Sequence, residues 1–204
     1  MKKLFAFILA LALCAASAFA EATPQPSPEA AFTPTDSTIL VACFSATDNT
    51  WPLAEYAAAS LNADLFRIEP EIPYTEADLN DGDSDSRANR EMNDETSRPA
   101  LKATVENVAQ YDTILLGFPI WWGQAPRLIE TFIEAHDLSG KTILPFCTSG
   151  GSGYGQTGEI LAALTDETVT WLEGRRFPAS ATAEEIAAWL QEMAIEPYAP
   201  SEEE

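Results

Sequence analysis

The sequence predicts an α/β protein built on a doubly wound parallel sheet with helices on both faces. The runs 38–44 and 113–118 are continuously apolar, which is typical of strands that are covered on both sides. Other segments have apolar residues at helical spacing, and they alternate along the chain with the strand-like runs. Strands that alternate with helices form parallel sheets, because each return along the sheet needs a crossover connection.

The predicted strands share short runs of apolar and β-branched residues. In chain order they cover residues 38–44, 64–68, 113–118, 142–147 and 169–172. The segment 70–99 is long and polar, and no helix or strand is predicted in it. Its arginines and Tyr74 suggest an insertion that packs near the site at the strand ends.

The predicted helices are indicated by their apolar spacing and by their first turns. Pro52 fits the first turn of a helix whose apolar face repeats at i, i+4 and i+8. Pro126 opens an amphipathic helix, and Thr182 with Glu185 forms a capping box that begins the last one. Two further helices are predicted over 100–109 and 158–164.

Composition excludes several classes of function. The 204 residues include 11 Lys+Arg against 32 Asp+Glu, which gives a formal net charge of −21 and a sequence pI of about 4.1. So few cations cannot form a surface that neutralises phosphates, so the chain is not expected to bind nucleic acid. Adhesion to anionic lipid is disfavoured for the same reason. A hydrophobic content of 46% excludes a wholly disordered chain.

The N-terminus has the pattern of an export signal. Lys2 and Lys3 precede the apolar run 4–13, and Ala18-Phe19-Ala20 follows as a cleavage site. A signal peptide is therefore predicted over 1–20, and the run is too short to span a bilayer. Lipoprotein anchoring through Cys14 is the alternative, which is disfavoured because the preceding residue is a leucine rather than a small one.

The predicted organisation continues with a proline-rich linker, one domain and an acidic tail. These cover residues 21–37, 38–196 and 197–204. Cys43 and Cys147 both lie inside apolar runs and are predicted to be buried thiols. A disulfide between them remains the alternative for an exported protein.

The loop 45–50 follows the first strand and precedes a helix. In doubly wound sheets, ligands bind beyond the carboxyl ends of the strands, so this loop is a candidate site. Backbone N–H groups at a helix start favour an anion, and hydroxyls add donors to phosphate oxygens. With no lysine or arginine in the loop, we expect a neutral cradle for a single terminal phosphate. An ordinary polar turn that caps the helix is the alternative. The candidate residues are Ser45, Thr47, Asp48, Asn49 and Thr50.

The loop 119–126 follows the third strand and contains two adjacent tryptophans. An indole left at a strand end is suited to stacking on a flat aromatic ligand. Packing of one indole beneath the neighbouring helix is the alternative. The candidate residues are Pro119, Ile120, Trp121, Trp122 and Gly123.

The loop 148–155 follows the fourth strand and holds four glycines, which allow the backbone to approach a ligand closely. A G-x-S-x-G nucleophile elbow around Ser152 is excluded, because position 154 is a tyrosine. The candidate residues are Ser149, Gly150, Gly151 and Gly153.

The three loops, in this order, resemble those of the flavodoxin-like FMN-binding proteins, over residues 38–195. The resemblance implies a five-stranded flavodoxin fold with FMN at the strand ends. The first loop would hold the ribityl phosphate, Trp121 or Trp122 would flank the isoalloxazine ring, and 149–153 would close its other edge. Asp48 stands where the family usually has glycine, and aspartate tolerates left-handed backbone better than most residues.

The resemblance also implies electron transfer, here outside the cytoplasm, with a redox partner protein or a small-molecule electron donor or acceptor. Two alternatives are an FMN-dependent NAD(P)H or quinone oxidoreductase, and a flavodoxin-fold binding module that has lost the flavin. The chemistry would belong to the cofactor. No catalytic side chain and no metal ligand are predicted, and the sequence does not address the oligomeric state.

Three weaker patterns compete with this interpretation. Gly153, Gly155 and Gly158 match a dinucleotide fingerprint with Glu173 as the ribose-binding acid, although such fingerprints follow a first strand. The acidic run 81–85 begins like a calcium loop but lacks the later ligands, so a solvated loop is predicted. His136 lies at a helix end, where we expect a positively charged C-terminal cap.

Overall fold

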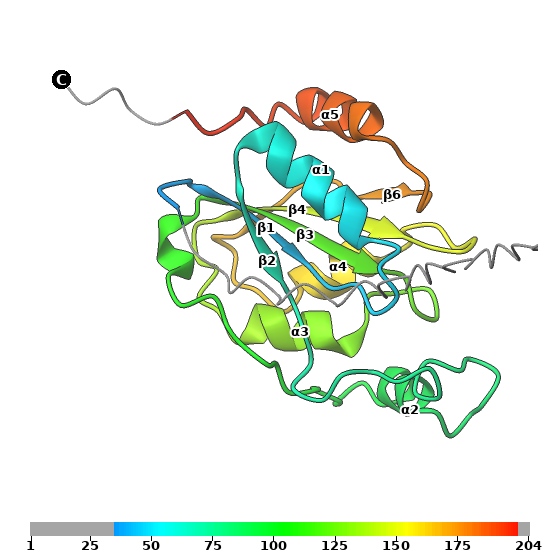
Figure 1. Ribbon diagram of the computed structural model, residues 1–204. Coiled ribbons are helices and arrows are strands. Elements are labelled where there is room, and N and C mark those ends of the chain that lie inside the picture. The colour runs from blue at the N-terminus through cyan, green and yellow to red at the C-terminus, as the bar shows by residue number, and fades with distance from the viewer. Residues whose placement is uncertain (1–34, 200–204) are drawn as a thin grey trace, which may run out of the picture. The chain divides into compact units, whose positions relative to one another are not determined.

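The computed structural model describes residues 35–199, and these form a parallel sheet between two layers of helices (Figure 1). The strand order is β2-β1-β3-β4-β5, and β6 also pairs with β4. The strands are β1 (Ile39–Cys43), β2 (Asp64–Arg67), β3 (Thr113–Pro119), β4 (Thr142–Thr148), β5 (Thr170–Trp171) and β6 (Arg175–Phe177). The predicted doubly wound fold with five strands in flavodoxin-like order is confirmed, with β6 as an addition.

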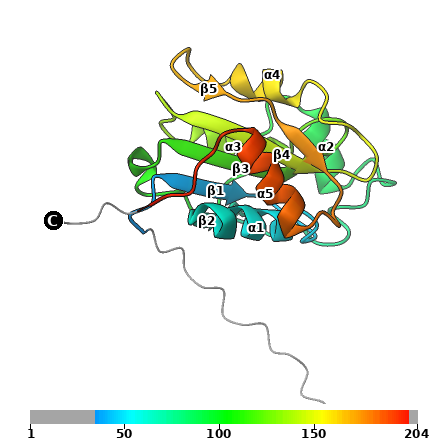
Figure 2. The same ribbon diagram turned by 90° about the horizontal axis from the view of Figure 1, so that it is seen from above.

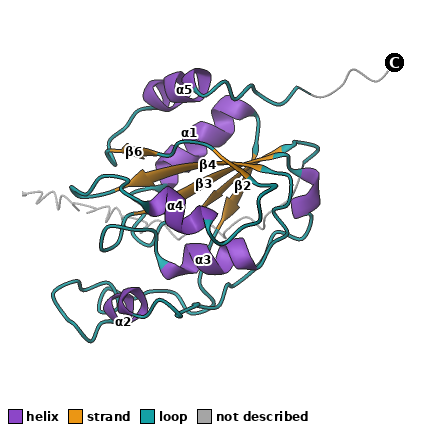
Figure 3. Cartoon of the chain, turned by 180° about the vertical axis from the view of Figure 1, so that it is seen from behind, coloured by secondary structure: helices purple, strands orange, loops and turns teal. Residues whose placement is uncertain are grey.

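The helices divide between the two faces of the sheet. They are α1 (Trp51–Leu61), α2 (Arg87–Asn93), α3 (Arg127–Glu134), α4 (Thr157–Ala162) and α5 (Ala183–Glu192), with a 3₁₀ turn η1 (Val108–Gln110). Helices α1 and α5 cover one face, and α3 and α4 cover the other (Figure 3). Figure 2 shows β5 and α4 together at one edge of the sheet. Helix α2 lies away from both layers, beyond the carboxyl ends of the strands (Figure 1).

The central strands are apolar throughout because both of their faces are covered. In β1, Leu40 and Ala42 pack on the α3 side, while Val41 and Cys43 pack on the α1 side. All five residues of β1 are at most 6% exposed. Burial of this apolar area from water supplies the main driving force of the fold.

Local signals in the sequence fix the ends of the two helices on the α1 side. Pro52 lies in the first turn of α1, which ends where Asn62 adopts left-handed backbone. Helix α5 begins with the predicted capping box: Thr182 accepts from the N–H of Glu185, whose carboxylate accepts from the N–H of Thr182.

The predicted helix over 100–109 is wrong. Leu101 instead forms a bridge with Pro70, and the N–H of Glu71 donates to the carbonyl of Ala100 at 2.8 Å. Only the short turn η1 follows at the end of this segment. Pairing with residues 69–71 satisfies the backbone without a helix, so tertiary contacts override local propensity. Strand β6 was not predicted, because its three residues include two arginines.

His136 ties the segment before η1 to the end of α3. Its Nδ1 lies 2.6 Å from the carbonyl oxygen of Phe132, and its Nε2 accepts from the N–H of Val105 at 2.9 Å. The predicted capping contact is therefore present, but its expected positive charge is wrong. A ring that accepts at Nε2 and donates at Nδ1 is neutral, and burial lowers the pKa of His136 below 6.5.

Both thiols of the described residues are free and buried, as predicted for Cys43 and Cys147.

The fold also begins earlier than the linker prediction placed it. Thr35 donates through its N–H and its hydroxyl to Asp64, and Ser37 is buried. The signal peptide 1–20, Cys14, residues 21–34 and the end of the tail (200–204) lie outside the described residues. Within residues 35–199, no helix has the length and apolar character needed to cross a bilayer.

Replacing Asp64 with asparagine will lower the free energy of unfolding by about 1–3 kcal/mol. The Asp64 carboxylate is only 4% exposed and also accepts the hydroxyl of Tyr111 at 2.6 Å. The amide group of asparagine turns one acceptor into a donor that faces other donors. Urea unfolding of the two proteins measures the difference. Asp36→Asn is the matched control, because Asp36 is exposed and follows Thr35 in the chain. Equal urea midpoints for Asp64→Asn and the wild type would contradict the prediction.

The His136→Gln variant will make stability less dependent on pH below about pH 6.5. Because folding lowers the pKa of His136, the unfolded chain binds this proton first as the pH falls. The contribution of neutral His136 is therefore present above the unfolded pKa and is lost as the pH falls below it. Urea unfolding at about pH 7.5 and about pH 5.5 checks this. A wild-type decline no steeper than that of the variant would refute it.

Candidate functional site

The three predicted loops meet at the carboxyl ends of β1, β3 and β4. The register places Cys43 beside Gly117 and Gly117 beside Phe146, so the loops begin next to one another. Two hydrogen bonds join them. The hydroxyls of Thr50 and Thr148 are 2.8 Å apart, and the N–H of Ile120 donates to the carbonyl of Thr148 at 2.8 Å.

The loop 45–50 leads into the N-terminus of α1 with several unused donors. Ser45 and Thr50 are buried at its ends, where the Ser45 hydroxyl accepts the N–H of Thr50 at 3.1 Å. Thr47, Asp48 and Asn49 are exposed between them, and the Asn49 amide donates to the Thr47 hydroxyl at 3.0 Å. Among the described residues, the N–H groups of 46–49 find no acceptor. They are free to bind an anion at a helix start.

Arg67 contributes to this loop a cation that the loop sequence does not predict. It ends β2 and pairs in register with Cys43, so its side chain reaches the loop that follows β1. The guanidinium forms an ion pair with Asp48, whose backbone is left-handed at φ 56°, and donates to the carbonyl of Ser45 at 3.3 Å. The expectation of a cradle without a basic residue is therefore corrected. The only signal in the sequence was the position of Arg67 at the end of a neighbouring strand.

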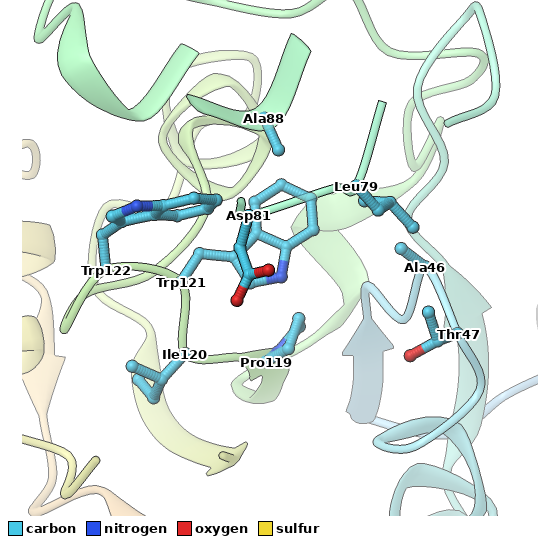
Figure 4. Close-up of a pocket in the computed structure, with 9 residues that line it drawn as sticks. All are labelled: Ala46, Thr47, Leu79, Asp81, Ala88, Pro119, Ile120, Trp121 and Trp122. Atoms are coloured by element: carbon cyan, nitrogen blue, oxygen red, sulfur yellow. The ribbon is translucent and has the colours of Figure 1, made fainter. Parts of the chain in front are cut away.

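The two tryptophans of the second loop have different environments (Figure 4). Trp121 packs edge-on against Phe44 and Tyr74, with ring centroids 5.5 and 5.3 Å apart. Backbone hydrogen bonds between Trp121 and Gln124 close a tight turn, in which Trp122 has a φ of 47° and is 46% exposed. Trp121 is therefore packed, although against Phe44 and Tyr74 rather than beneath a helix, and Trp122 presents the more exposed indole.

A pocket of about 580 Å³ opens between the first two loops and the segment 70–99. Figure 4 shows its lining: Ala46, Thr47, Leu79, Asp81, Ala88, Pro119, Ile120, Trp121 and Trp122. Five predicted site residues therefore share one pocket. The pocket lining does not include the other predicted residues of the first two loops, which are Ser45, Asp48, Asn49, Thr50 and Gly123. Leu79, Asp81 and Ala88 were not predicted as site residues, since they come from a segment without a recognised motif.

The segment 70–99 forms one wall of this pocket and is braced by its own polar contacts. Arg87 lies over the Tyr74 ring at 4.2 Å and pairs with Glu91 at 2.6 Å, and Tyr74 donates to Glu91. Asn89 donates to the carbonyls of Asp81 and Asp83, which shapes the acidic run from within. In the part of the chain that the structure describes, no group of three or more His, Cys, Asp or Glu can hold a metal ion.

The same wall is tied to α3 through an ion-pair cluster. Arg127 pairs with Glu130, both 5% exposed in their side chains, and donates to the carbonyl of Met92 at 3.2 Å. Arg98 bridges Glu130 and Glu134 at 2.7 and 2.9 Å. The Arg127–Glu130 pair lies within α3, so the wall is joined to this helix by the contact of Arg127 with Met92 and by the ion pairs of Arg98.

The third loop lies beside the pocket rather than in its lining. Arg176 of β6 donates to the Ser149 hydroxyl at 3.2 Å and to its carbonyl at 2.8 Å. None of Ser149, Gly150, Gly151 and Gly153 lines the pocket. A Cβ atom at Gly158 would lie 2.9 Å from the Tyr154 hydroxyl and 3.2 Å from its ring, so this glycine has a packing role. The dinucleotide-fingerprint alternative loses its support, because that glycine is explained and the loop follows β4 rather than β1.

Comparison with known proteins agrees with this geometry. Two solved structures are similar in sequence and in fold, each described as a presumed flavoprotein. The one from Bacteroides eggerthii is 46% identical with a TM-score of 0.72, and covers 78% of this chain and 98% of its own. The one from Bacteroides uniformis is 42% identical with a TM-score of 0.72, and covers 75% of this chain and 97% of its own.

A more distant structure shares the fold. It is a flavoprotein in complex with FMN from Lactobacillus acidophilus, 19% identical with a TM-score of 0.55, covering 68% of this chain and 91% of its own. A search of curated proteins finds no match. The model of the flavodoxin family matches residues 38–193, over the whole sheet and all three loops. The chain therefore belongs to the flavodoxin family.

Proposed function

We propose that this protein binds FMN in the pocket at the strand ends and transfers electrons outside the cytoplasm. The observation that carries the proposal is one continuous site with two chemically different ends. The N–H groups of 46–49, which have no acceptor among residues 35–199, form one end, and the exposed Trp122 indole stands at the other. The FMN complex of the Lactobacillus acidophilus protein, which has the same fold, supports this choice of ligand.

The residues present fit each part of the cofactor. The N–H groups of 46–49 and the Thr47 hydroxyl are donors for a phosphate, and the pairing of Asp48 with Arg67 removes an uncompensated negative charge. Trp122 and Ile120 offer flat and apolar surface for the isoalloxazine ring. A volume of about 580 Å³ lies within the range that small-molecule and cofactor sites occupy.

The protein contributes binding, orientation and electrostatics to this chemistry. When bound, FMN supplies the exchange of one or two electrons. Asp81 at the pocket and the formal net charge of −21 disfavour additional negative charge, which lowers the reduction potential of a bound flavin. The same acidic field attracts a basic redox partner and repels an acidic one.

Export is supported by the sequence of the N-terminus. Lys2 and Lys3, the apolar run 4–13 and Ala18-Phe19-Ala20 together have the order of a signal peptide. An intact mass of the protein isolated from its natural host tests the proposal. A mature chain that begins at Glu21 supports export, and a chain that retains Lys2 and Lys3 argues against it.

A small-molecule oxidoreductase is the second candidate, and the wall of the pocket favours it. Leu79 and Ala88 add apolar surface to the pocket, which suits contact with a compact apolar electron acceptor. We expect the FMN-loaded protein to oxidise NADH in the presence of a quinone if this candidate is correct. Single-turnover reduction without steady-state oxidation would favour the electron carrier.

Titration of the purified chain with FMN will quench flavin fluorescence with a one-to-one end point. This result follows from a single site in which an indole faces the ring. The same experiment tests the third possibility, a flavodoxin-fold module without flavin. A colourless protein that causes no quenching at micromolar FMN would refute the flavoprotein proposal.

Replacing Trp122 with alanine will weaken FMN binding by about 1 kcal/mol or more, as expected for the loss of one aromatic stack. Its effect on stability will be small, because the side chain is 46% exposed. Trp121→Ala is the matched comparison. It will lower the unfolding midpoint more, because Trp121 packs against Phe44 and Tyr74. Equal, small losses of FMN affinity in the two variants would contradict the stacking role of Trp122.

A further inference from the structure

Arg67 is held in one position by three neighbours around the loop 45–50. Its guanidinium pairs with the Asp48 carboxylate, donates to the Ser45 carbonyl at 3.3 Å, and lies over the Trp51 ring at 4.5 Å. The same nitrogen, Nη2, makes both polar contacts. One guanidinium group therefore joins the beginning of the loop to its left-handed residue.

Asp48 makes this cation necessary for an anion in the loop. Its side chain is 68% exposed and belongs to the same turn as the N–H groups of 46–49, for which residues 35–199 provide no acceptor. A phosphate bound there would stand beside a like charge, which opposes binding. The paired guanidinium cancels that charge. Its contact with the Ser45 carbonyl also supports the turn at Asp48, where φ is 56°.

We propose that Arg67 is the positioning residue that makes this loop a phosphate site. By neutralising Asp48 and fixing the left-handed turn, it gives the protein its preference for FMN over riboflavin, the flavin that lacks the phosphate. The inference rests on the proposed FMN binding. It adds a basic residue from the neighbouring strand β2, which the spacing of the loop motif does not reveal.

The test compares dissociation constants of the full chain for FMN and for riboflavin, measured by fluorescence quenching. Arg67→Gln will weaken FMN binding by about tenfold or more, as expected when a charge-assisted contact beside an anion is lost. Riboflavin binding will change by no more than about twofold, because this flavin places no charge at the loop. Arg175→Gln is the matched control: it removes one positive charge at an exposed pair with Glu192, away from the pocket.

A second pair of variants separates charge compensation from structural support. In the Asp48→Asn background, Arg67→Gln will cost much less FMN affinity, because no carboxylate then requires neutralisation. Asparagine also accepts left-handed backbone, so the turn is retained. Equal losses for FMN and riboflavin in Arg67→Gln would overturn the inference. The same loss of FMN affinity in the wild-type and Asp48→Asn backgrounds would overturn it too.

A readout without flavin keeps the test decisive if Arg67→Gln folds poorly. Inorganic phosphate at millimolar concentration will raise the thermal midpoint of the wild type and of Arg175→Gln, because a ligand of the folded state stabilises it. Arg67→Lys, which retains the charge, will keep part of this effect, and Arg67→Gln will lose it. A phosphate response unchanged in both Arg67 variants would overturn the inference.

If the wild type binds neither flavin, the proposed function is refuted. If the wild type binds both flavins with equal affinity, the inference alone is refuted.

Discussion

The parallel pairing of β1 with β3 is the constraint on which the rest of the structure depends. Both strands are buried on both faces, and their register sets Cys43 beside Gly117. Gly117 has no freedom to change, because any side chain there would collide with the Phe146 ring of β4. The parallel register of β1 and β3 brings the loops at 45 and 119 to one edge of the sheet. The pocket, the two tryptophans and the loop 45–50 all lie at that edge.

Much of the fold could be predicted because its signals are local. Continuous apolar runs identified β1, β3 and β4, and Pro52 and the Thr182 capping box identified the helices α1 and α5. Elements set by distant pairing escaped prediction. The segment 100–109 is extended at Leu101, where it bridges to Pro70, instead of forming the helix that its own residues favour. Strand β6 forms because it pairs with β4. Both elements depend on contacts with residues distant in the sequence, and local sequence patterns do not reveal those contacts.

The outline of the candidate site could also be predicted, because the three loop motifs are local in the sequence. The loops after three strands were expected to meet, and they do, because parallel strands end at one edge. The side chains that complete the site come from elsewhere in the chain. Arg67 arrives from β2, and Leu79 and Ala88 arrive from a polar segment without a motif. The different environments of Trp121 and Trp122 depend on one tight turn, which the dipeptide alone does not specify.

The burial of the two core cysteines affects how the folded domain responds to redox conditions. Burial raises the pKa of Cys147 to about 12 and that of Cys43 further, so the thiolate form is negligible near neutral pH. Disulfide exchange and oxidation both proceed through the thiolate. Once folded, the domain therefore resists oxidants and mixed-disulfide formation alike. Within the described residues the two thiols form no disulfide, so a reductant has no cross-link to cleave there.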